Sequence, residues 1–191
     1  MKHFRLSLLL IAAIILTSLS ACSNVNKNGH KIENFTFTDQ NGEKLGLKDL
    51  KGNVWVADFM FTSCADICPQ LTKYMRDLQK EIKKKGYDDV HFVSFSVDPE
   101  VDKPKALKNY ASKFEADFST WHLLTGYSQD KIKDFAMDNF KNIIVKPEND
   151  TQVVHGTSFY LVNKDGEVVK DYSTQNGFTL SEIVKDIKAL R

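Results

Sequence analysis

The chain has 191 residues, which is enough for one domain with a sizeable core and too few for two domains of ordinary size. Its content of 42% hydrophobic and 27% charged residues argues against an intrinsically disordered protein. The net charge is +1, and it becomes −1 when Lys2 and Arg5 are set aside as the charges that precede Cys22, because 24 basic and 25 acidic residues remain. This balance argues against a nucleic-acid-binding protein, which needs a concentrated basic face.

The start of the chain has the pattern of a secretory signal. Lys2 and Arg5 precede an apolar run over residues 6–16, and Leu-Ser-Ala-Cys follows at 19–22. This tetrapeptide resembles a bacterial lipobox, which implies cleavage before Cys22 and attachment of a diacylglycerol to its thiol. The alternative is a retained transmembrane helix, but the uncharged stretch of about 16 residues is shorter than the ~20 that a span needs. We therefore expect residues 1–21 to be a lipoprotein signal peptide, and the protein to be lipid-anchored to the extracytoplasmic face of the cell membrane.

The residues after Cys22 predict a tether and then a folded domain. Residues 24–29 are polar and lack apolar periodicity, so we interpret 22–30 as a lipid-anchored flexible tether and 31–191 as the domain. Residues 32–38 and 43–47 flank Asn41-Gly42, a strong hairpin signal, so the domain is expected to open with a small antiparallel pair.

The middle of the chain alternates strands and helices. Residues 54–61 are nearly all apolar, as expected for a strand buried on both faces. A loop with two cysteines follows, and Pro69 suits the first turn of a helix whose apolar residues recur every three or four positions until residue 82. Residues 90–97 predict a second strand and 104–114 a helix, with Asp102 as a possible N-cap.

The last third predicts a strand at 121–124, a helix over 128–140, and a hairpin formed by 158–162 and 168–169. Thr179-Leu180-Ser181-Glu182 has the pattern of a capping box before a final amphipathic helix. The order indicates an α/β fold with helices on both faces of a central sheet. A thioredoxin-type arrangement of these elements places the cysteine loop at the carboxyl edge of the sheet, where α/β proteins tend to have their sites.

Once Cys22 is assigned to the anchor, Cys64 and Cys68 are the remaining thiols. They lie four residues apart at a predicted helix N-terminus, whose partial positive charge favours the thiolate, and therefore both nucleophilic attack and metal ligation. The alternative is a structural disulfide or two inert thiols, although a bridge that closes so small a loop adds little constraint. Outside the cytosol the pair can form a disulfide.

Two thiolates make an incomplete metal site, and the five histidines of the sequence are the candidates for a third ligand. His3 falls in the signal and His30 in the tether, while His91 and His122 lie at or beside strand starts, where surface or core roles are ordinary. His155 stands just before a predicted strand, in a loop with access to the cysteine edge. Two sulfurs and one imidazole suit copper, especially Cu(I), and with a fourth ligand also zinc.

The motifs around these residues resemble the Sco family of copper chaperones, also called SenC. The resemblance rests on Phe61-Thr62-Ser63-Cys64-Ala65-Asp66-Ile67-Cys68-Pro69, on Val97-Asp98-Pro99 followed by Lys103-Pro104, and on Val154-His155 followed by Phe159-Tyr160-Leu161-Val162. It runs from about Phe35 to the C-terminus. Family members commonly have Pro at the position of Ala65, a departure that bears on the rigidity of the loop and leaves the ligands intact.

The resemblance implies a thioredoxin-like fold, with a central mixed sheet, helices on both faces and an N-terminal β-hairpin, in which Cys64, Cys68 and His155 bind Cu(I) or Cu(II). It also implies a role in maturing the dinuclear copper centre of cytochrome c oxidase subunit II. Asp98 falls on the family's Asp-Pro motif and is expected to lie behind the copper ligands, unless the motif is simply a turn that ends a strand.

Three functions remain open at this stage. The first is a metallochaperone that transfers copper by ligand exchange. The second is an extracytoplasmic thiol–disulfide oxidoreductase that uses Cys64 and Cys68 as a redox-active pair. The third is a redox or copper sensor, which needs a signalling partner that the sequence does not indicate. His155 discriminates between the first two, because thiol exchange can proceed without it and three-coordinate copper binding cannot.

Overall fold

The structure is a computed structural model that describes residues 29–148, 150–174 and 179–191. The predicted signal peptide (1–21), the lipidation site at Cys22 and most of the predicted tether lie outside these residues. His30, the last residue of that tether, pairs with Val168 in the sheet. Across the three described ranges, no helix has the length and apolar character needed to cross a bilayer.

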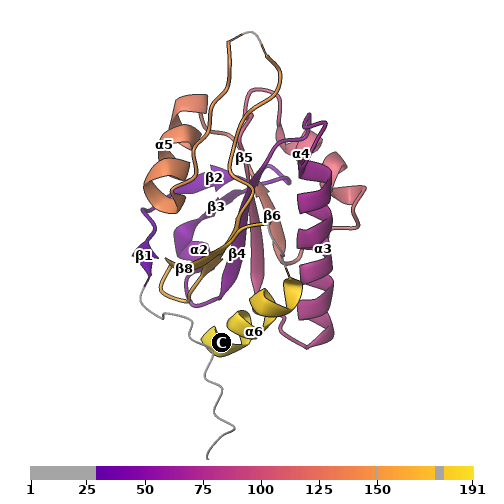
Figure 1. Cartoon of the computed structure of the whole chain (residues 1–191), viewed down its shortest axis with the longest axis vertical. Helices are drawn as coiled ribbons and strands as arrows, with labels where there is room; N and C mark the ends of the chain where they lie inside the picture. Colours follow the sequence, from indigo (N-terminus) through magenta and orange to yellow (C-terminus); the bar gives the residue numbers. More distant parts are fainter. Residues whose placement is uncertain (1–28, 149, 175–178) are drawn as a thin grey trace, which may run out of the picture.

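A six-stranded mixed sheet forms the centre of the domain (Figure 1). Its order is β1-β8-β7-β4-β5-β6, with β4, β5 and β6 parallel and the pairs β4–β7, β7–β8 and β1–β8 antiparallel. Strand β4 is buried along its whole length, as its apolar sequence predicts. The strands are β1 (His30–Lys31), β4 (Trp55–Met60), β5 (His91–Ser96), β6 (Trp121–Leu124), β7 (Phe159–Val162) and β8 (Glu167–Tyr172).

Helices cover both faces of this sheet, which confirms the predicted α/β class (Figure 1). On one face α3 (Cys68–Lys84) contacts α6 (Leu180–Leu190), and α4 (Pro104–Ser112) joins α3 through a 3.0 Å hydrogen bond between the Thr72 and Tyr110 hydroxyls. On the other face α5 (Gln129–Phe140) packs its aromatic side chains against Phe59 and Phe95, with ring centroids 5.3–5.8 Å apart. The cysteines lie where β4 leads into α3: Cys64 is in the loop that leaves the carboxyl end of β4, and Cys68 is in the first turn of α3.

The predicted N-terminal hairpin is present and shorter than expected. Strands β2 (Thr36–Thr38) and β3 (Lys44–Gly46) pair antiparallel, and the Asp39 carboxylate accepts the backbone N–H groups of Asn41 and Glu43 in the turn between them. Gly42 has φ +85°, a conformation that favours glycine. A short helix that the sequence did not predict, α2 (Leu47–Leu50), follows directly.

Two of the predicted helix caps are wrong. Asp102 does not cap α4, because its carboxylate accepts hydrogen bonds from Thr62 and Ser96 instead. Thr179 makes no side-chain cap on α6, and the Glu182 side chain pairs with Lys170. The side chains of Asp102 and Glu182, which the local patterns assigned to caps, bind partners elsewhere in the chain instead.

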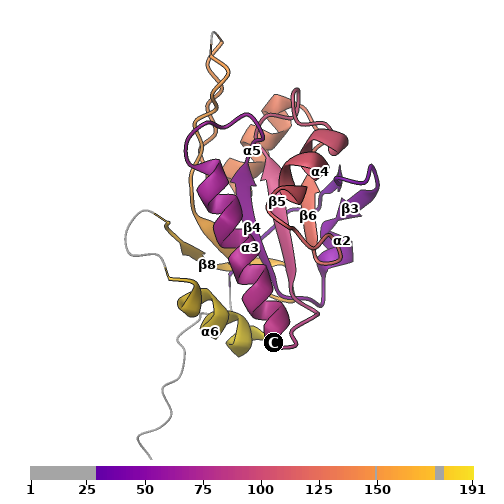
Figure 2. The same cartoon turned by 90° about the vertical axis from the view of Figure 1, so that its right-hand side faces the viewer.

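The chain between α5 and β7 leaves the body of the domain as an arm (Figure 2). We call residues 142–156 the histidine arm, of which position 149 is not described. Val145 and Val154 face each other in an antiparallel bridge with two backbone hydrogen bonds of 2.9 Å. This bridge holds the two sides of the arm together just before His155.

Candidate metal centre

The two cysteines lie at the junction of β4 and α3. Cys68 is the first residue of α3 and is fully buried, whereas Cys64 is half-buried in the loop that precedes the helix. Neither cysteine is in a disulfide. The backbone N–H of Cys68 donates to the Cys64 sulfur over 3.5 Å, so the helix N-terminus directs one of its unpaired donors at this thiol.

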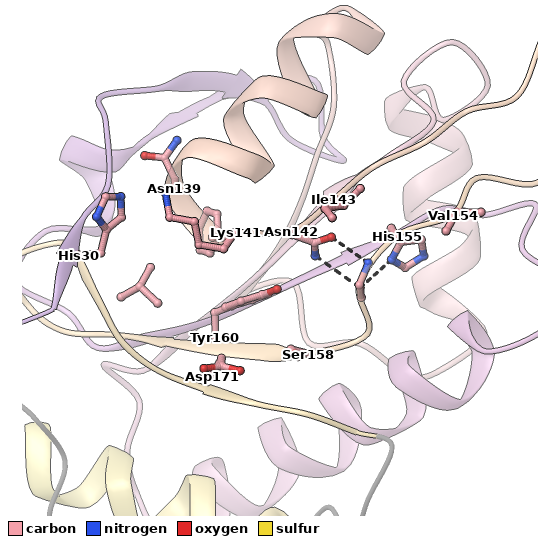
Figure 3. Close-up of a pocket in the computed structure, with 13 residues that line it drawn as sticks. His30, Asn139, Lys141, Asn142, Ile143, Val154, His155, Ser158, Tyr160 and Asp171 are labelled. Carbon is pink, nitrogen blue, oxygen red and sulfur yellow. Dashed lines mark hydrogen bonds between the residues drawn. The ribbon is translucent and has the colours of Figure 1, made fainter.

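The structure brings His155 to the same place. Its Nε2 atom lies 3.6 Å from the Cys68 sulfur. Its Nδ1 atom lies 2.9 Å from the Gly156 carbonyl oxygen, which can only accept, so the proton of the neutral ring is on Nδ1 (Figure 3). Nε2 therefore has a free lone pair on the side of Cys68, the arrangement that metal-binding histidines use.

This separation suits two ligands of one metal ion. Metal–sulfur and metal–nitrogen bonds of about 2.3 and 2.0 Å, at angles of about 110–120°, place the two ligand atoms about 3.5–3.7 Å apart. Among the described residues, no three His, Cys, Asp or Glu side chains are arranged as a complete metal site. Cys68 and His155 thus form a prearranged pair of possible ligands, with the half-buried Cys64 beside Cys68.

Burial favours the uncharged form of both side chains in this pair. Loss of solvent raises the pKa of the Cys68 thiol well above its usual range, and it lowers the pKa of His155. Burial therefore opposes the thiolate that the helix N-terminus is expected to favour at Cys68. A metal ion that binds Cys68 has to displace its proton.

Asp98 lies in a buried turn after β5. Its side chain is 3% exposed, and its carboxylate receives Lys146 of the histidine arm, with Nζ 2.8 Å from Oδ1. The backbone N–H of Asp98 donates to the Ser96 hydroxyl. Asp98 thus connects with the arm that carries His155, through a lysine that the sequence analysis missed.

Asp102, four residues later, holds the cysteine loop. Its carboxylate accepts the Thr62 backbone N–H at 3.1 Å, the Thr62 hydroxyl at 2.5 Å and the Ser96 hydroxyl at 2.6 Å. Thr62 precedes Cys64 by two residues, so this network fixes the start of the loop. No local pattern could have indicated the pairing, because 40 residues separate Thr62 from Asp102.

The other described histidines lie away from the cysteines in ordinary environments. His91 and His122 stack on neighbouring strands, with Nδ1 of one 3.3 Å from Nε2 of the other. Burial lowers the pKa of both, that of His122 to about 4. His30 binds the Asp138 carbonyl oxygen through Nε2 at 3.0 Å. These contacts agree with the ordinary roles expected for His91 and His122, whereas His30, which was expected in the tether, pairs in the sheet.

An open cleft of about 710 Å³ begins beside His155 (Figure 3). It runs past Tyr160 toward His30, and its rim includes Ile143 and Val154 from the two sides of the arm. These two side chains are 61% and 63% exposed. The edge of the candidate centre is therefore bordered by apolar surface on the histidine arm.

Comparisons with known proteins identify one family that this chain resembles. A model of the SCO1/SenC family matches residues 23–191. The crystal structure of a SCO1/SenC family lipoprotein from Bacillus anthracis str. Ames is 51% identical, and the match covers 85% of this chain and 95% of that one with a TM-score of 0.81.

Two further structures add functional context. One is BsSco, a member of the Sco family of cytochrome c oxidase assembly proteins, in which a disulfide switch was identified. BsSco is 47% identical to this chain, and the match covers 87% of this chain and 96% of BsSco with a TM-score of 0.79. Bradyrhizobium japonicum ScoI with copper bound is 28% identical; 84% of this chain and 99% of ScoI match, with a TM-score of 0.71. These likenesses confirm the predicted thioredoxin-like fold.

Proposed function

The chain belongs to the SCO1/SenC family, and on this basis we propose that it is a copper chaperone in the assembly of cytochrome c oxidase. Copper is its cargo, held by Cys64, Cys68 and His155 and passed to the dinuclear centre of subunit II. The observation that carries the proposal is the 3.6 Å approach of His155 Nε2 to the Cys68 sulfur. Copper bound to the related ScoI supports the choice of metal.

The chemistry of the donor set supports copper loading and release. Two soft sulfurs and one imidazole favour Cu(I) over harder cations. Cys68 is buried and Cys64 is half-buried, so a ligand from an acceptor reaches the copper from the side of Cys64 and His155. Transfer then proceeds by exchange, in which an incoming thiolate or imidazole replaces one ligand at a time.

A lipid anchor at Cys22 accounts for the predicted location. The related Bacillus anthracis protein is a lipoprotein, which supports the same anchor here. We propose that the residues between Cys22 and β1 tether the domain to the extracytoplasmic face of the membrane, where it meets a membrane-bound acceptor.

Thiol–disulfide exchange is the second candidate, favoured by two unbridged thiols at one helix terminus. In this reaction the Cys64 thiolate attacks a substrate disulfide and releases one substrate thiolate. Cys68 then attacks the Cys64 sulfur, releases the second, and leaves a Cys64–Cys68 disulfide. The substrate gains two electrons, and the disulfide switch identified in BsSco supports the reversibility of such a pair.

The two candidates are separated by titrating the reduced full-length protein with Cu(I) in detergent, without oxygen, against a chromophoric chelator. We expect a one-to-one complex, and sulfur-to-copper charge-transfer bands after oxidation to Cu(II). His155→Ala should weaken Cu(I) binding more than about 100-fold, beyond what loss of an outer contact costs. It should leave the Cys64–Cys68 pair reducible, and His30→Ala is the matched histidine control. Equal affinity in His155→Ala and the wild type would contradict the three-ligand site and favour exchange chemistry.

A further inference from the structure

The two segments that carry the copper ligands meet at one turn. We call residues 98–102 the acidic turn; it follows β5 and contains Asp98, Glu100 and Asp102. Asp102 binds Thr62 at the start of the cysteine loop, and Asp98 binds Lys146 of the histidine arm. The cysteine loop and the histidine arm, 40 to 48 residues away from the turn, are thus held by the same five residues.

Lys146 is the charged contact between the arm and the turn. Its ammonium group lies 2.8 Å from an oxygen of Asp98 and 2.8 Å from an oxygen of Glu100. The two partners differ in environment, because the Asp98 side chain is 3% exposed and that of Glu100 is 72% exposed. A buried carboxylate depends on its partner far more than an exposed one, so the contact with Asp98 carries the interaction.

The position of Lys146 connects this ion pair to the imidazole. Its neighbour Val145 exchanges two backbone hydrogen bonds with Val154, and His155 is the next residue. On the far side of the ring, Asn142 holds Gly156 through a 2.8 Å bond from the Gly156 N–H to its side-chain oxygen. A displacement of Lys146 is therefore transmitted through the Val145–Val154 bridge to the segment that carries His155.

We propose that Lys146 is a positioning residue that clamps the histidine arm to Asp98 and thereby holds His155 Nε2 beside Cys68. This inference rests on the proposed copper site and adds to it a residue that touches no copper ligand directly. The clamp explains why a buried aspartate lies in the turn, and it makes retention of copper depend on an ion pair between the arm and the acidic turn.

The test replaces Lys146 with Met, which keeps the length of the side chain and removes its charge. We expect copper affinity of the reduced full-length protein in detergent to fall about ten-fold, as for loss of an outer contact to a metal ligand. The charge-transfer bands of the Cu(II) form should shift, and Lys146→Arg should restore both readouts. Asp98→Asn should reproduce the loss, which provides a second route if Lys146→Met does not fold.

Two control variants and one double variant test whether Lys146 acts through Asp98 and His155. Glu100→Gln, which removes the exposed partner, and Lys133→Met, an exposed lysine on α5, should each change the affinity less than about two-fold. In a His155→Ala background, Lys146→Met should have no further effect, because its action passes through the imidazole.

The outcomes separate this inference from the function on which it rests. Wild-type affinity and spectrum in both Lys146→Met and Asp98→Asn overturn the clamp, as does an equal loss with and without His155. If His155→Ala itself binds copper as the wild type does, the three-ligand site fails and the clamp fails with it. If His155→Ala weakens binding and Lys146→Met does not, only the clamp is overturned.

Discussion

Asp58 in the middle of β4 should make the stability of the protein fall as pH rises. Its side chain is fully buried under α3, and one carboxylate oxygen has no hydrogen-bond partner. Burial raises the pKa of this carboxyl from 3.8 to about 7, against a smaller lowering by its hydrogen bond to Ser94. Because the folded pKa lies above the unfolded one, the stabilisation is complete below about pH 4 and is lost as pH rises through 7.

The magnitude follows from this shift. A difference of about three pKa units corresponds to about 4 kcal/mol of unfolding free energy lost between pH 4 and 7. Asp58→Asn removes the titration and costs about 1–2 kcal/mol relative to the protonated carboxyl, because the amide leaves buried N–H groups unpaired. The variant should therefore be less stable than the wild type at pH 4 and about 2–3 kcal/mol more stable at pH 8.

Urea unfolding of the reduced, metal-free protein across this pH range measures the effect, with the fluorescence of the buried Trp55 and Trp121 as the signal. Asp134→Asn, an exposed position on α5, is the control and should follow the wild-type curve. Parallel stability curves for wild type and Asp58→Asn, with no crossing between pH 4 and 8, would refute the reasoning.

Three further predictions concern the cysteine loop. Asp102→Ala leaves three donors from Thr62 and Ser96 unpaired and should lower the unfolding free energy by about 3 kcal/mol in urea titrations; a loss below about 0.5 kcal/mol would argue against the network. In the reduced protein, iodoacetamide should label the half-buried Cys64 well before the buried Cys68, and mass spectrometry of early time points should find Cys68 unmodified. If Cys68 is a copper ligand, it has to lose its proton on binding, so apparent copper affinity should rise with pH, by up to about ten-fold per unit for each proton released; a pH-independent affinity contradicts proton displacement.

Periodicity in the sequence predicted most of the helices and strands, because the apolar residues of each element repeat at the spacing of the face that the element buries. The apolar run at 54–61 became the fully buried β4, and the three- and four-residue spacing after Pro69 became α3. Where the prediction failed, a local signal competed with a distant partner. Asp102 stands one residue before the Lys103 N-cap position, yet it binds Thr62 and Ser96, because a buried carboxylate is better stabilised by three donors than by one helix terminus.

The residues of the candidate centre were likewise only partly predictable from the sequence. Cys64 and Cys68 were visible from their spacing, and His155 from its place before a strand, whereas Lys146 had no signal. A lysine in a polar loop is ordinary surface until the fold brings a buried carboxylate within 2.8 Å. Sequence motifs identify groups that bind a metal directly, because ligand chemistry restricts the residue types. They miss the groups that hold those ligands in place, because any complementary charge at the right point in space can do so.

This distinction bears on how the chaperone releases its cargo. A chaperone has to bind copper tightly enough to load and loosely enough to transfer it, and a rigid three-ligand site favours loading alone. The three proposed ligands differ in this respect: Cys68 is buried in the first turn of α3, Cys64 lies in a half-buried loop, and His155 stands on an arm whose Lys146 pairs with Asp98. If the proposed clamp between Lys146 and Asp98 opens, His155 loosens first and copper stays on the two sulfurs. The release that we propose therefore needs a movement of the arm and no unfolding of the sheet that holds the cysteines.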